Sequence, residues 1–480
     1  MLIPSLDTNS AIGVAIVVTI YLVGLLHVLH AVMHVRTSQG TIAWIACLLL
    51  VPFISIPLYW LLVRSRFSRN VGGRREMDER LAKISAAMHQ SLAECEVELP
   101  DDDAFERAAR QLGGLPFTRG NSLELLIDGE QTFARIFEVI AATKRYLCVN
   151  FYIVKSDRLG TKFQDALIER ALAGVKVYFL FDEIGSHKLP KAYLRKMTDA
   201  GIQCHSFGVN RYWWSRLQLN FRNHRKILVS DGKTAFIGGL NVGDEYLGRD
   251  QRYGGWRDTH LRLRGPVVQA VQMVFLEDWF WAANEIPDLD WVTAPEPADQ
   301  IAAIIPTGPA DDAESWQLIV AEAANTARKR LWIASPYFVP DEGILTALQV
   351  AALRGVDVRI LIPEKADQLL IWLSAFTFYE QAIPLGVKIH HYTNGFLHEK
   401  VLLIDERMAA VGSANIDNRS CRLNFEITAF SQNPKFVCEV EEMLRNDFSH
   451  SREASLDDFC KKPFLFRVAC RTARLLAPVQ

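Results

Sequence analysis

Two stretches of the chain carry the same pattern of ionisable residues ahead of a short apolar run. Residues 224–231 read HRKILVSD and residues 398–405 read HEKVLLID, each with a histidine, a lysine two positions later and an aspartate five positions after the lysine. The match continues with GGLN at 238–241 and GSAN at 412–415. Coincidence over so many fixed positions is improbable, so we infer an internal duplication.

The doubled pattern is suited to chemistry on a phosphodiester. A histidine and a lysine two positions apart on a strand project from the same face, so two such units related by a twofold axis would present four groups to one cleft. The lysines can balance the phosphate charge, one histidine can attack phosphorus, and the other can move protons on the leaving and incoming alcohols. We therefore predict four catalytic residues, His224, Lys226, His398 and Lys400.

Further polar residues follow each motif. Asp231 and Asp405 either orient a histidine or cap the turn after the strand, and we include them among the predicted catalytic residues. Asn241, Ser413 and Asn415 are predicted to donate hydrogen bonds to the phosphate. No group of His, Cys and carboxylate residues with metal-ligand spacing lies near either motif, so we expect no metal and no other cofactor.

The elements ahead of each motif repeat as well. Each half contains a predicted buried strand, a helix that ends at a glycine, and a second buried strand. This alternation predicts an α/β fold with a largely parallel sheet. The predicted elements are strands at 146–154 and 176–182 around a helix at 163–175, and strands at 331–339 and 357–363 around a helix at 344–356.

The N-terminus is predicted to form a transmembrane hairpin. Two apolar runs, at about 11–35 and 41–63, each approach the ~20 residues that a membrane-crossing helix needs. The first ten residues contain no Lys or Arg, and a second apolar run follows, which favours an anchor over a cleaved signal peptide. Pro52 and Pro57 are expected to kink the second span. Because five arginines follow that span, at 64–75, both termini are predicted to be cytoplasmic.

The composition divides the chain into four segments. The hairpin occupies residues 1–65, and a charged linker or collar occupies 66–115. The first repeat is predicted at 116–292 and the second at 293–480, with a basic helix at its end. Prolines and polar residues cluster at the boundary between the repeats, near 293–300.

Charge and cysteine content exclude several classes of protein. The formal net charge is −2, which gives no basic surface for nucleic acid, so we expect no nucleic-acid partner. The eight cysteines include no C-x-x-C pair and fit a reduced compartment and core packing better than a disulfide framework or a zinc site.

Three other segments bear on membrane contact. His27, His30 and His34 share a helix face, which we interpret as a polar seam in preference to a metal site, because no fourth ligand accompanies them. Residues 210–221, NRYWWSRLQLNF, combine aromatic residues with arginines as membrane interfaces do. Residues 461–476, KKPFLFRVACRTARLL, fit either a peripheral membrane helix or an ordinary docked C-terminal helix.

The motifs carry a family resemblance. HRKILVSDGKTAFIGGLN and HEKVLLIDERMAAVGSAN resemble the two HKD motifs of the phospholipase D superfamily. The segments RTSQGTIAWIACLLLVPFISIPLYW, GGWRDTHLRLRGP and SPYFVPDE are similar to those of bacterial cardiolipin synthases, and the resemblance extends over nearly the whole chain. One departure is Gly239, which stands where the family often has a serine.

The resemblance implies two phospholipase D-like α/β repeats, related by a pseudo-twofold axis, that form one catalytic unit in the bacterial cytoplasmic membrane. It implies transfer of a phosphatidyl group from one phosphatidylglycerol to another, which gives cardiolipin and glycerol through a phosphohistidine. It also implies that His224 is the nucleophile and His398 the proton carrier. A membrane-anchored phospholipase D that hydrolyses headgroups is the alternative. The acceptor lipid and the oligomeric state, for which a homodimer is one option, stay open.

Overall fold

The fold is described from a computed structural model, which covers residues 8–35, 38–62, 75–97, 104–113, 115–208, 221–365 and 367–477. The chain forms two compact units, and each is described by itself. One comprises Met1–Asn70 with Asn210–Asn220, and the other comprises Val71–Val209 with Phe221–Gln480. The aromatic and arginine-rich segment predicted to meet a membrane lies outside the described residues, except for its last residue, Phe221.

The N-terminal unit contains three apolar helices, α1 (Thr8–His34), α2 (Ser38–Leu50) and α3 (Pro52–Leu62). Residues 12–34 of α1 are long and apolar enough to cross a membrane, with mean hydropathy 2.5, and no other helix among the described residues is. The predicted second span differs, because it is divided between α2 and α3, of 13 and 11 residues. Each is shorter than the ~20 residues that one crossing helix needs.

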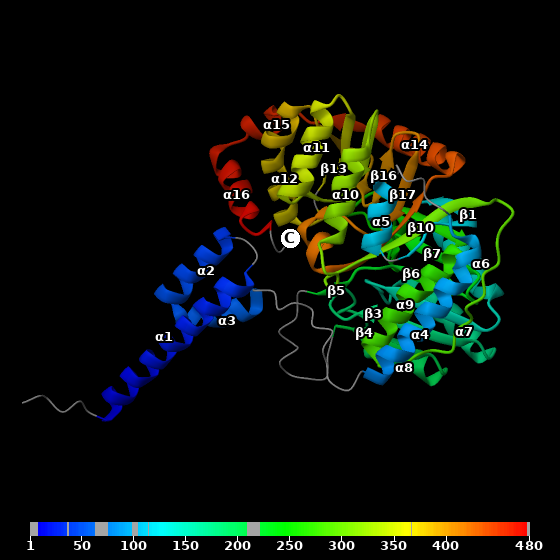
Figure 1. Cartoon of the computed structure of the whole chain (residues 1–480), viewed down its shortest axis with the longest axis horizontal. Coiled ribbons are helices and arrows are strands. Elements are labelled where there is room, and N and C mark those ends of the chain that lie inside the picture. The colour runs from blue at the N-terminus through cyan, green and yellow to red at the C-terminus, as the bar shows by residue number, and fades with distance from the viewer. Residues whose placement is uncertain are drawn as a thin grey trace, which may run out of the picture. The chain divides into compact units, whose positions relative to one another are not determined.

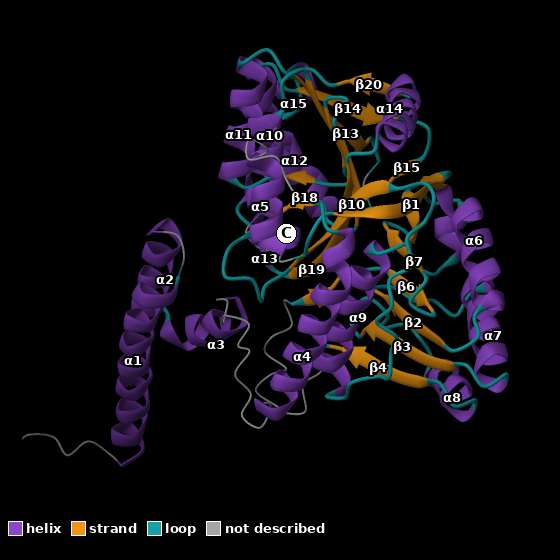
Figure 2. Cartoon of the chain, turned by 45° about the vertical axis from the view of Figure 1, so that its right-hand side comes forward, coloured by secondary structure: helices purple, strands orange, loops and turns teal. Residues whose placement is uncertain are grey.

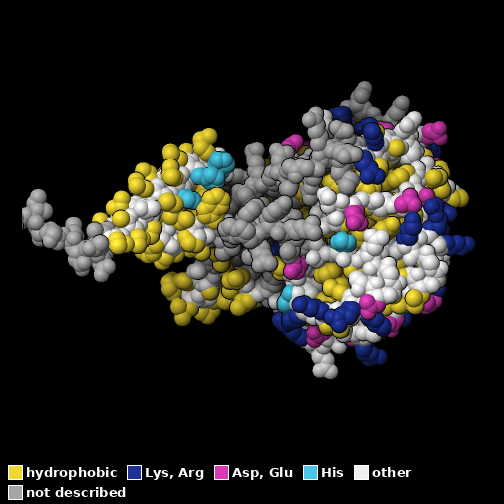
Figure 3. All heavy atoms as spheres, turned by 90° about the horizontal axis from the view of Figure 1, so that it is seen from below, with side chains coloured by type: hydrophobic (Ala, Val, Ile, Leu, Met, Phe, Trp, Pro, Cys, Tyr) yellow, Lys and Arg dark blue, Asp and Glu magenta, His cyan; other side chains and the backbone are white. Residues whose placement is uncertain are grey.

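Hydrophobic side chains cover the visible surface of the N-terminal helices (Figure 3). The exception is the histidine face of α1, whose polar atoms meet aromatic residues of α3. Trp60 donates a hydrogen bond from Nε1 to Nε2 of His27 at 2.7 Å, and Nδ1 of His30 lies 2.7 Å from the hydroxyl of Tyr59. These contacts fit the polar seam expected from the sequence. Among the described residues, no three His, Cys, Asp or Glu side chains are arranged to hold a metal.

The larger unit is built on one sheet with internal symmetry (Figure 1). The first half of the chain gives the order β4-β3-β2-β6-β7-β9-β1, and the second gives β10-β19-β17-β16-β11-β13-β14-β20. The halves meet where β1 pairs antiparallel with β10, and the order outward from this junction is the same on both sides up to β4 and β14. This is the arrangement expected of two α/β repeats related by a pseudo-twofold axis.

Only part of the sheet is parallel, which corrects the expectation of a largely parallel sheet. In each half the two pairs outside the motif strand are parallel, β2–β3 and β3–β4 or β11–β13 and β13–β14, whereas the motif strand and its neighbours pair antiparallel. The motif strand belongs to a tight hairpin, which reverses the chain direction. The strands are β1 (Thr118–Ile127), β2 (Tyr146–Phe151), β3 (Lys176–Asp182), β4 (Gln203–Phe207), β5 (Arg222–Asn223), β6 (Ile227–Ser230), β7 (Thr234–Gly238), β8 (Trp256–Arg257), β9 (Thr259–Arg264), β10 (Gln300–Thr307), β11 (Arg330–Ala334), β12 (Phe338–Val339), β13 (Asp357–Pro363), β14 (Lys388–Tyr392), β15 (Phe396–Leu397), β16 (Val401–Ile404), β17 (Met408–Gly412), β18 (Ile416–Asp417), β19 (Asn424–Ser431) and β20 (Ser451–Glu453).

Helices cover both faces of the sheet. Helices α6–α8 lie on one side of it and α10–α12 on the other (Figure 2). Helix α5, inside the predicted linker, joins the second repeat, since Phe105 is buried in that core. The remaining helices are α4 (Arg75–Leu92), α5 (Ala104–Gly113), α6 (Asp128–Ala142), α7 (Arg158–Leu172), α8 (Lys191–Asp199), α9 (Val267–Ala283), α10 (Ser315–Thr326), α11 (Glu342–Leu353), α12 (Leu369–Ala382), α13 (Asn418–Arg422), α14 (Pro434–Ser449), α15 (Asp457–Cys460) and α16 (Phe464–Arg474), with short 3₁₀ helices at Ala93–Cys95, Asp244–Leu247 and Ile383–Leu385.

The two motif aspartates lie at the hairpin turns, away from the histidines. Asp231 accepts hydrogen bonds from the backbone N–H groups of residues 144, 145 and 146 at 2.8–2.9 Å. Asp405 accepts from those of residues 328, 329 and 330 at 2.8–3.3 Å. Both have left-handed backbone conformations, with φ of 52° and 53°. Asp231 and Asp405 therefore cap the hairpin turns. The prediction that they orient a histidine is wrong, because their carboxylates are bonded to backbone N–H groups at the turns.

The first testable prediction concerns Asp231. Replacement by alanine leaves three backbone donors without their acceptor and places an alanine at positive φ, so we expect Asp231→Ala to lower the free energy of unfolding by about 1–3 kcal/mol. Catalysis by the folded fraction should stay within about twofold of wild type, since no reacting group moves. Thermal unfolding in detergent and kcat measure the two effects. A large loss of kcat at unchanged Tm would restore the catalytic assignment.

Candidate active site

Each motif histidine is attached to the opposite repeat through its backbone. His224 follows β5, which pairs with β19 of the second repeat, and its N–H donates to the carbonyl of Phe425 at 3.0 Å. His398 follows β15, which pairs with β8 of the first repeat, and its N–H donates to the carbonyl of Arg257 at 2.7 Å. The motif histidines and lysines thus precede strands β6 and β16, whereas the sequence predicted them inside one strand.

The side chain of each histidine is also held by the opposite repeat. Nδ1 of His224 lies 2.9 and 3.0 Å from the carboxylate oxygens of Glu426, and Nδ1 of His398 lies 2.8 Å from Oδ2 of Asp258. Both carboxylates are fully buried. A carboxylate on Nδ1 fixes the tautomer that leaves Nε2 unprotonated and available for chemistry. No described residue forms a hydrogen bond with Nε2 of either ring.

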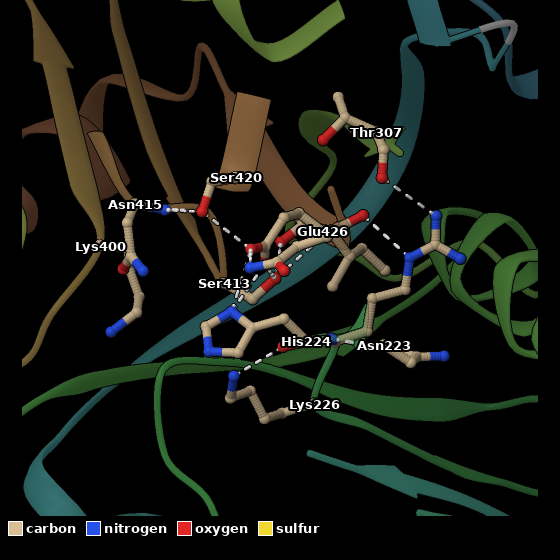
Figure 4. Close-up of polar contacts among 12 residues, drawn as sticks. Asn223, His224, Lys226, Thr307, Lys400, Ser413, Asn415, Ser420 and Glu426 are labelled. Atoms are coloured by element: carbon tan, nitrogen blue, oxygen red, sulfur yellow. Dashed lines mark hydrogen bonds and ion pairs between the residues drawn. The ribbon is translucent and has the colours of Figure 1, made fainter. Parts of the chain in front are cut away.

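Glu426 is the centre of a dense hydrogen-bond network (Figure 4). Ser413 donates to its Oε2 at 2.6 Å, Ser420 to its Oε1 at 2.9 Å, and Asn424 to its Oε1 at 3.2 Å. Burial opposes ionisation, but the charge and hydrogen bond of His224, with the other nearby donors, hold the pKa of Glu426 below its ordinary value. The carboxylate is thereby kept ionised beside the histidine.

Asp258 is held by a different set of contacts, which explains Gly239. The backbone N–H of Thr259 donates to Oδ1 at 2.8 Å, and Nε1 of Trp256 donates to Oδ2 at 3.3 Å. A Cβ atom on Gly239 would lie 1.9 Å from Oδ1 of Asp258. The position that carries Ser413 in the second repeat must therefore be glycine in the first, because the carboxylate fills the space that a side chain would need.

The two lysines complete a shared cluster of cationic groups. Nζ of Lys226 donates to the carbonyl of His224 at 2.6 Å, and Nζ of Lys400 lies 2.9 Å from Nδ1 of His398. Burial lowers the pKa of Lys226 to about 7 and that of Lys400 to about 8. Lys226 and Lys400 also repel each other's positive charge, which shows that the two motifs occupy one electrostatic environment.

The histidines are shifted in the same direction. Burial, together with the positive charge of the lysines of both motifs, lowers the pKa of His224 to about 4 and that of His398 to about 3. Both imidazoles are therefore neutral at physiological pH in this state. Two lysines and two imidazoles, all buried around one place, form a binding site for an anion such as a phosphodiester.

The three predicted phosphate ligands have other partners in the structure. Asn241 accepts from the N–H of Ile153 at 3.0 Å and donates to the hydroxyl of Tyr246 at 3.1 Å, so its amide holds a loop. Ser413 donates to Glu426, as described. Asn415 donates only a long bond of 3.4 Å, to Asp417, and its buried Oδ1 lacks a partner. Hence, of the three, Asn415 alone keeps a weakly engaged amide N–H that can donate to a phosphate oxygen.

Asp258 and Glu426 were not predicted from the sequence. Each is an isolated acid near the start of a strand after the motif, and Glu426 lies in NFEITAFS, where every residue of the strand is buried. A single carboxylate in a fully buried strand requires a partner, and this is the signal that could have revealed it. Its partner lies 202 residues away in the other repeat, which no local pattern identifies.

Comparison with known proteins agrees with this geometry. The family model "Cardiolipin synthase, PLD-like domain" matches residues 136–279 and 320–448, one segment in each repeat. The chain is 41% identical over 463 residues to cardiolipin synthase A of Pseudomonas putida (strain W619), covering 96% of this chain and 97% of that one. It is 41% identical over 466 residues to cardiolipin synthase A of Pseudomonas fluorescens (strain SBW25), covering 96% and 97%.

Among solved structures, the phosphatidylserine synthase of Haemophilus influenzae Rd KW20 superposes with a TM-score of 0.61 at 15% identity, covering 79% of this chain and all of that chain. This likeness shows a shared fold. The fold and the paired histidine–lysine site define a protein of the phospholipase D superfamily. The chain belongs to its cardiolipin synthase family.

The second testable prediction concerns Gly239. A methyl group at this position must displace Asp258 and with it the ring of His398, so we expect Gly239→Ala to lower kcat by about 10–100-fold, as loss of an orienting partner does. The matched control is Gly255→Ala, whose Cβ would meet only the carbonyl oxygen of Asn394 at an ordinary 3.6 Å. Steady-state kinetics of both variants give the comparison. Equal kcat values for the two variants would show that the position of the Asp258 carboxylate does not depend on a glycine at residue 239.

Proposed function

We propose that the protein is a cardiolipin synthase that transfers the phosphatidyl group of one phosphatidylglycerol to the headgroup of another and releases glycerol. The observation that carries the proposal is the pair of buried histidines, each held by a carboxylate of the opposite repeat, beside two buried lysines. Membership of the cardiolipin synthase family supplies the substrate class. Phosphatidylglycerol and cardiolipin are thus the proposed lipid partners.

In the first step the lysines bind the phosphate oxygens. Nε2 of His224 attacks phosphorus, the P–N bond forms, and the P–O bond to glycerol breaks as His398 gives its Nε2 proton to the leaving oxygen. In the second step His398 takes the proton from a hydroxyl of the second phosphatidylglycerol, whose oxygen attacks phosphorus. The P–N bond breaks, and cardiolipin and the original form of both histidines result. Lys226 and Lys400 balance the charge that develops on the phosphate.

The environment of the histidines supports these roles. Burial keeps His224 neutral, so its Nε2 lone pair is available for attack. His398 must carry a proton to act as an acid, and the negative charge of a bound phosphodiester raises the pKa of a neighbouring imidazole. The direction of the assignment, with His224 as nucleophile, rests on the resemblance of the first motif to its family, since the two carboxylate-bound histidines are nearly symmetric. We keep Asn415 as a further proposed phosphate ligand. Asp231 and Asp405 are assigned structural roles, because each caps a hairpin turn.

We further propose an inner-membrane location with two crossings. Helix α1 has the length of one crossing, and α2 with α3, 24 residues in all from 13 and 11, would return the chain to the side of entry. The arginines that follow α3 in the sequence favour cytoplasmic termini and a cytoplasmic catalytic unit.

We also keep the proposed boundary between the first and second repeats near residues 293–300.

The alternative function is a membrane-anchored phospholipase D. Its first step is the same, and water in place of an alcohol resolves the phosphohistidine. The proposed transferase therefore depends on access of a lipid alcohol to the site.

The third testable prediction concerns the products. Purified enzyme given phosphatidylglycerol with a labelled glycerol headgroup should release labelled glycerol and form cardiolipin, with little phosphatidic acid, by mass spectrometry. His224→Ala and His398→Ala should each reduce transfer by more than about 10³-fold while the fold is retained, because each carries a separate step. Phosphatidic acid as the main product would establish the hydrolase, and an active histidine variant would contradict the shared site.

The fourth testable prediction concerns pH. kcat/KM reports the free enzyme, in which the pKa of His398 is lowered to about 3, whereas kcat reports the complex, in which bound phosphate raises it. Because the acid form of His398 is lost as pH rises, the alkaline limb of kcat/KM should lie at lower pH than that of kcat, by more than about one pH unit. Profiles of both constants from pH 3 to 9 would test this. Coincident limbs would mean that substrate does not change the protonation of the site.

A further inference from the structure

The C-terminal helix α16 has one face packed on the second repeat. Cys470 and Ala473 are buried, and the ring of Phe466 lies 5.9 Å from that of Trp372 on α12. Further along the two helices, the guanidinium of Arg474 lies 4.8 Å over the ring of Phe378. These contacts fit the docked helix that was one of the two interpretations of this segment, and they show that α12 and α16 run in the same direction.

The opposite face of α16 is apolar and exposed. Leu465 is 78% exposed, Val468 42% and Leu475 78%, and these residues recur at helical spacing on one side. Phe464, at 70%, and Leu476, at 47%, extend this side at the two ends. We refer to these five residues as the α16 surface. The helix thus has a second apolar face that no described residue covers.

Positive charge borders the α16 surface. The segment 461–476 contains five Lys and Arg residues and no Asp or Glu. Arg467, Arg471 and Arg474 follow one another at three- and four-residue spacing along the flank nearer α12, where Nε of Arg467 is buried and the guanidinium of Arg474 lies over Phe378. Lys461, which pairs with Asp457 at 2.6 Å, and Lys462 stand at the start of the helix. The side chain of Arg471 is 67% exposed and makes only a 3.4 Å contact with Glu380. An apolar helix face with basic flanks is the composition that binds an anionic lipid surface.

The α16 surface adjoins the catalytic cluster through α12. Because the two helices run in the same direction, the first residues of α12, Leu369 and Leu370, lie at the same end as the start of α16, and they are 64% and 51% exposed. Asp367, two residues before α12, lies close enough to Lys400 for each to influence the pKa of the other. Exposed leucines therefore begin two residues after Asp367, the carboxylate that interacts with the catalytic Lys400.

We propose that the α16 surface, with the start of α12, inserts among the headgroups of an anionic phospholipid bilayer and holds the catalytic unit against the membrane. The proposal rests on the proposed function for the identity of the lipid substrate. It adds a second membrane contact to the N-terminal helices. A substrate whose acyl chains stay in the bilayer can then bring its phosphate to Lys400 without leaving the membrane.

A bilayer fits the α16 surface better than a second protein chain. Protein interfaces commonly lose charged residues at their centre and place complementary charges around it. Here all the charges that border the surface on its own segment have one sign, so a twofold pairing of two copies would bring like charges together. Anionic lipid headgroups supply the opposite charge and hydrocarbon together.

The fifth testable prediction uses the full-length enzyme. Leu465→Ser/Val468→Ser should lower kcat/KM on phosphatidylglycerol in anionic vesicles by about tenfold, equivalent to about 1.4 kcal/mol, because two buried apolar contacts with lipid are lost. On monomeric short-chain phosphatidylglycerol, kcat/KM should stay within about twofold of wild type. The control is Leu172→Ser/Leu353→Ser, which removes leucines that are 73% and 67% exposed on other helices. This control should behave as wild type on both substrates.

A second readout detects contact directly and does not require turnover. A fluorophore at Leu465→Cys, in a chain whose exposed Cys47, Cys438 and Cys460 are replaced by serine, should be quenched by doxyl-labelled lipid. The same fluorophore at Leu172→Cys should not be quenched. Absence of quenching, or equal activity loss on both substrates, would overturn the proposal. A lower molecular mass of the serine variant by light scattering in detergent would assign the surface to a second copy instead. If no lipid is turned over but quenching occurs, the proposed function fails and the membrane contact stands.

Discussion

The structure depends on one interaction made twice, a buried histidine whose Nδ1 is held by a carboxylate from the opposite repeat. An unpaired carboxylate in these positions would be costly, since Glu426 and Asp258 are fully buried. Glu426 lies on β19, which pairs with the short strand β5 ahead of His224, and Asp258 directly follows β8, which pairs with the short strand β15 ahead of His398. Backbone pairing and side-chain pairing thus fix the same junction, and neither repeat can complete a site by itself.

The duplication has diverged where the two carboxylates differ in length. The longer Glu426 reaches its histidine with support from the hydroxyl of Ser413, whereas the shorter Asp258 is supported by backbone and indole donors and fills the space beside Gly239. The glycine that departs from the family pattern is therefore the counterpart of the aspartate. Burial lowers the pKa of both lysines and both histidines. The negative charge of an entering phosphodiester favours the protonated form of these groups.

Local patterns predicted the repeated elements well. The strands predicted at 176–182 and 357–363 are β3 and β13 at the same residues. The helices between the predicted strands begin earlier than expected, at Arg158 and Glu342, because Asp157 and Asp341 cap them through hydrogen bonds from residues 160 and 344.

What the sequence could not supply is the pairing between distant residues. The motif histidines and lysines come together as predicted, but the groups that hold the histidines are 140 and 202 residues away. The motif aspartates, which lie in the pattern itself, are occupied by backbone donors at the turns. The break between α2 and α3 falls at Pro52, one of the two prolines expected to kink this span, whereas Pro57 lies inside α3.

The central claim is that the two motifs form one site with one nucleophile. The most direct test is to mix full-length enzyme with phosphatidylglycerol, quench it under conditions that preserve phosphohistidine, and locate the adduct by mass spectrometry of the intact chain and its peptides. The account predicts at most one phosphatidyl group per chain, on the peptide that contains His224. Two groups per chain, or an adduct on both motif peptides, would contradict it.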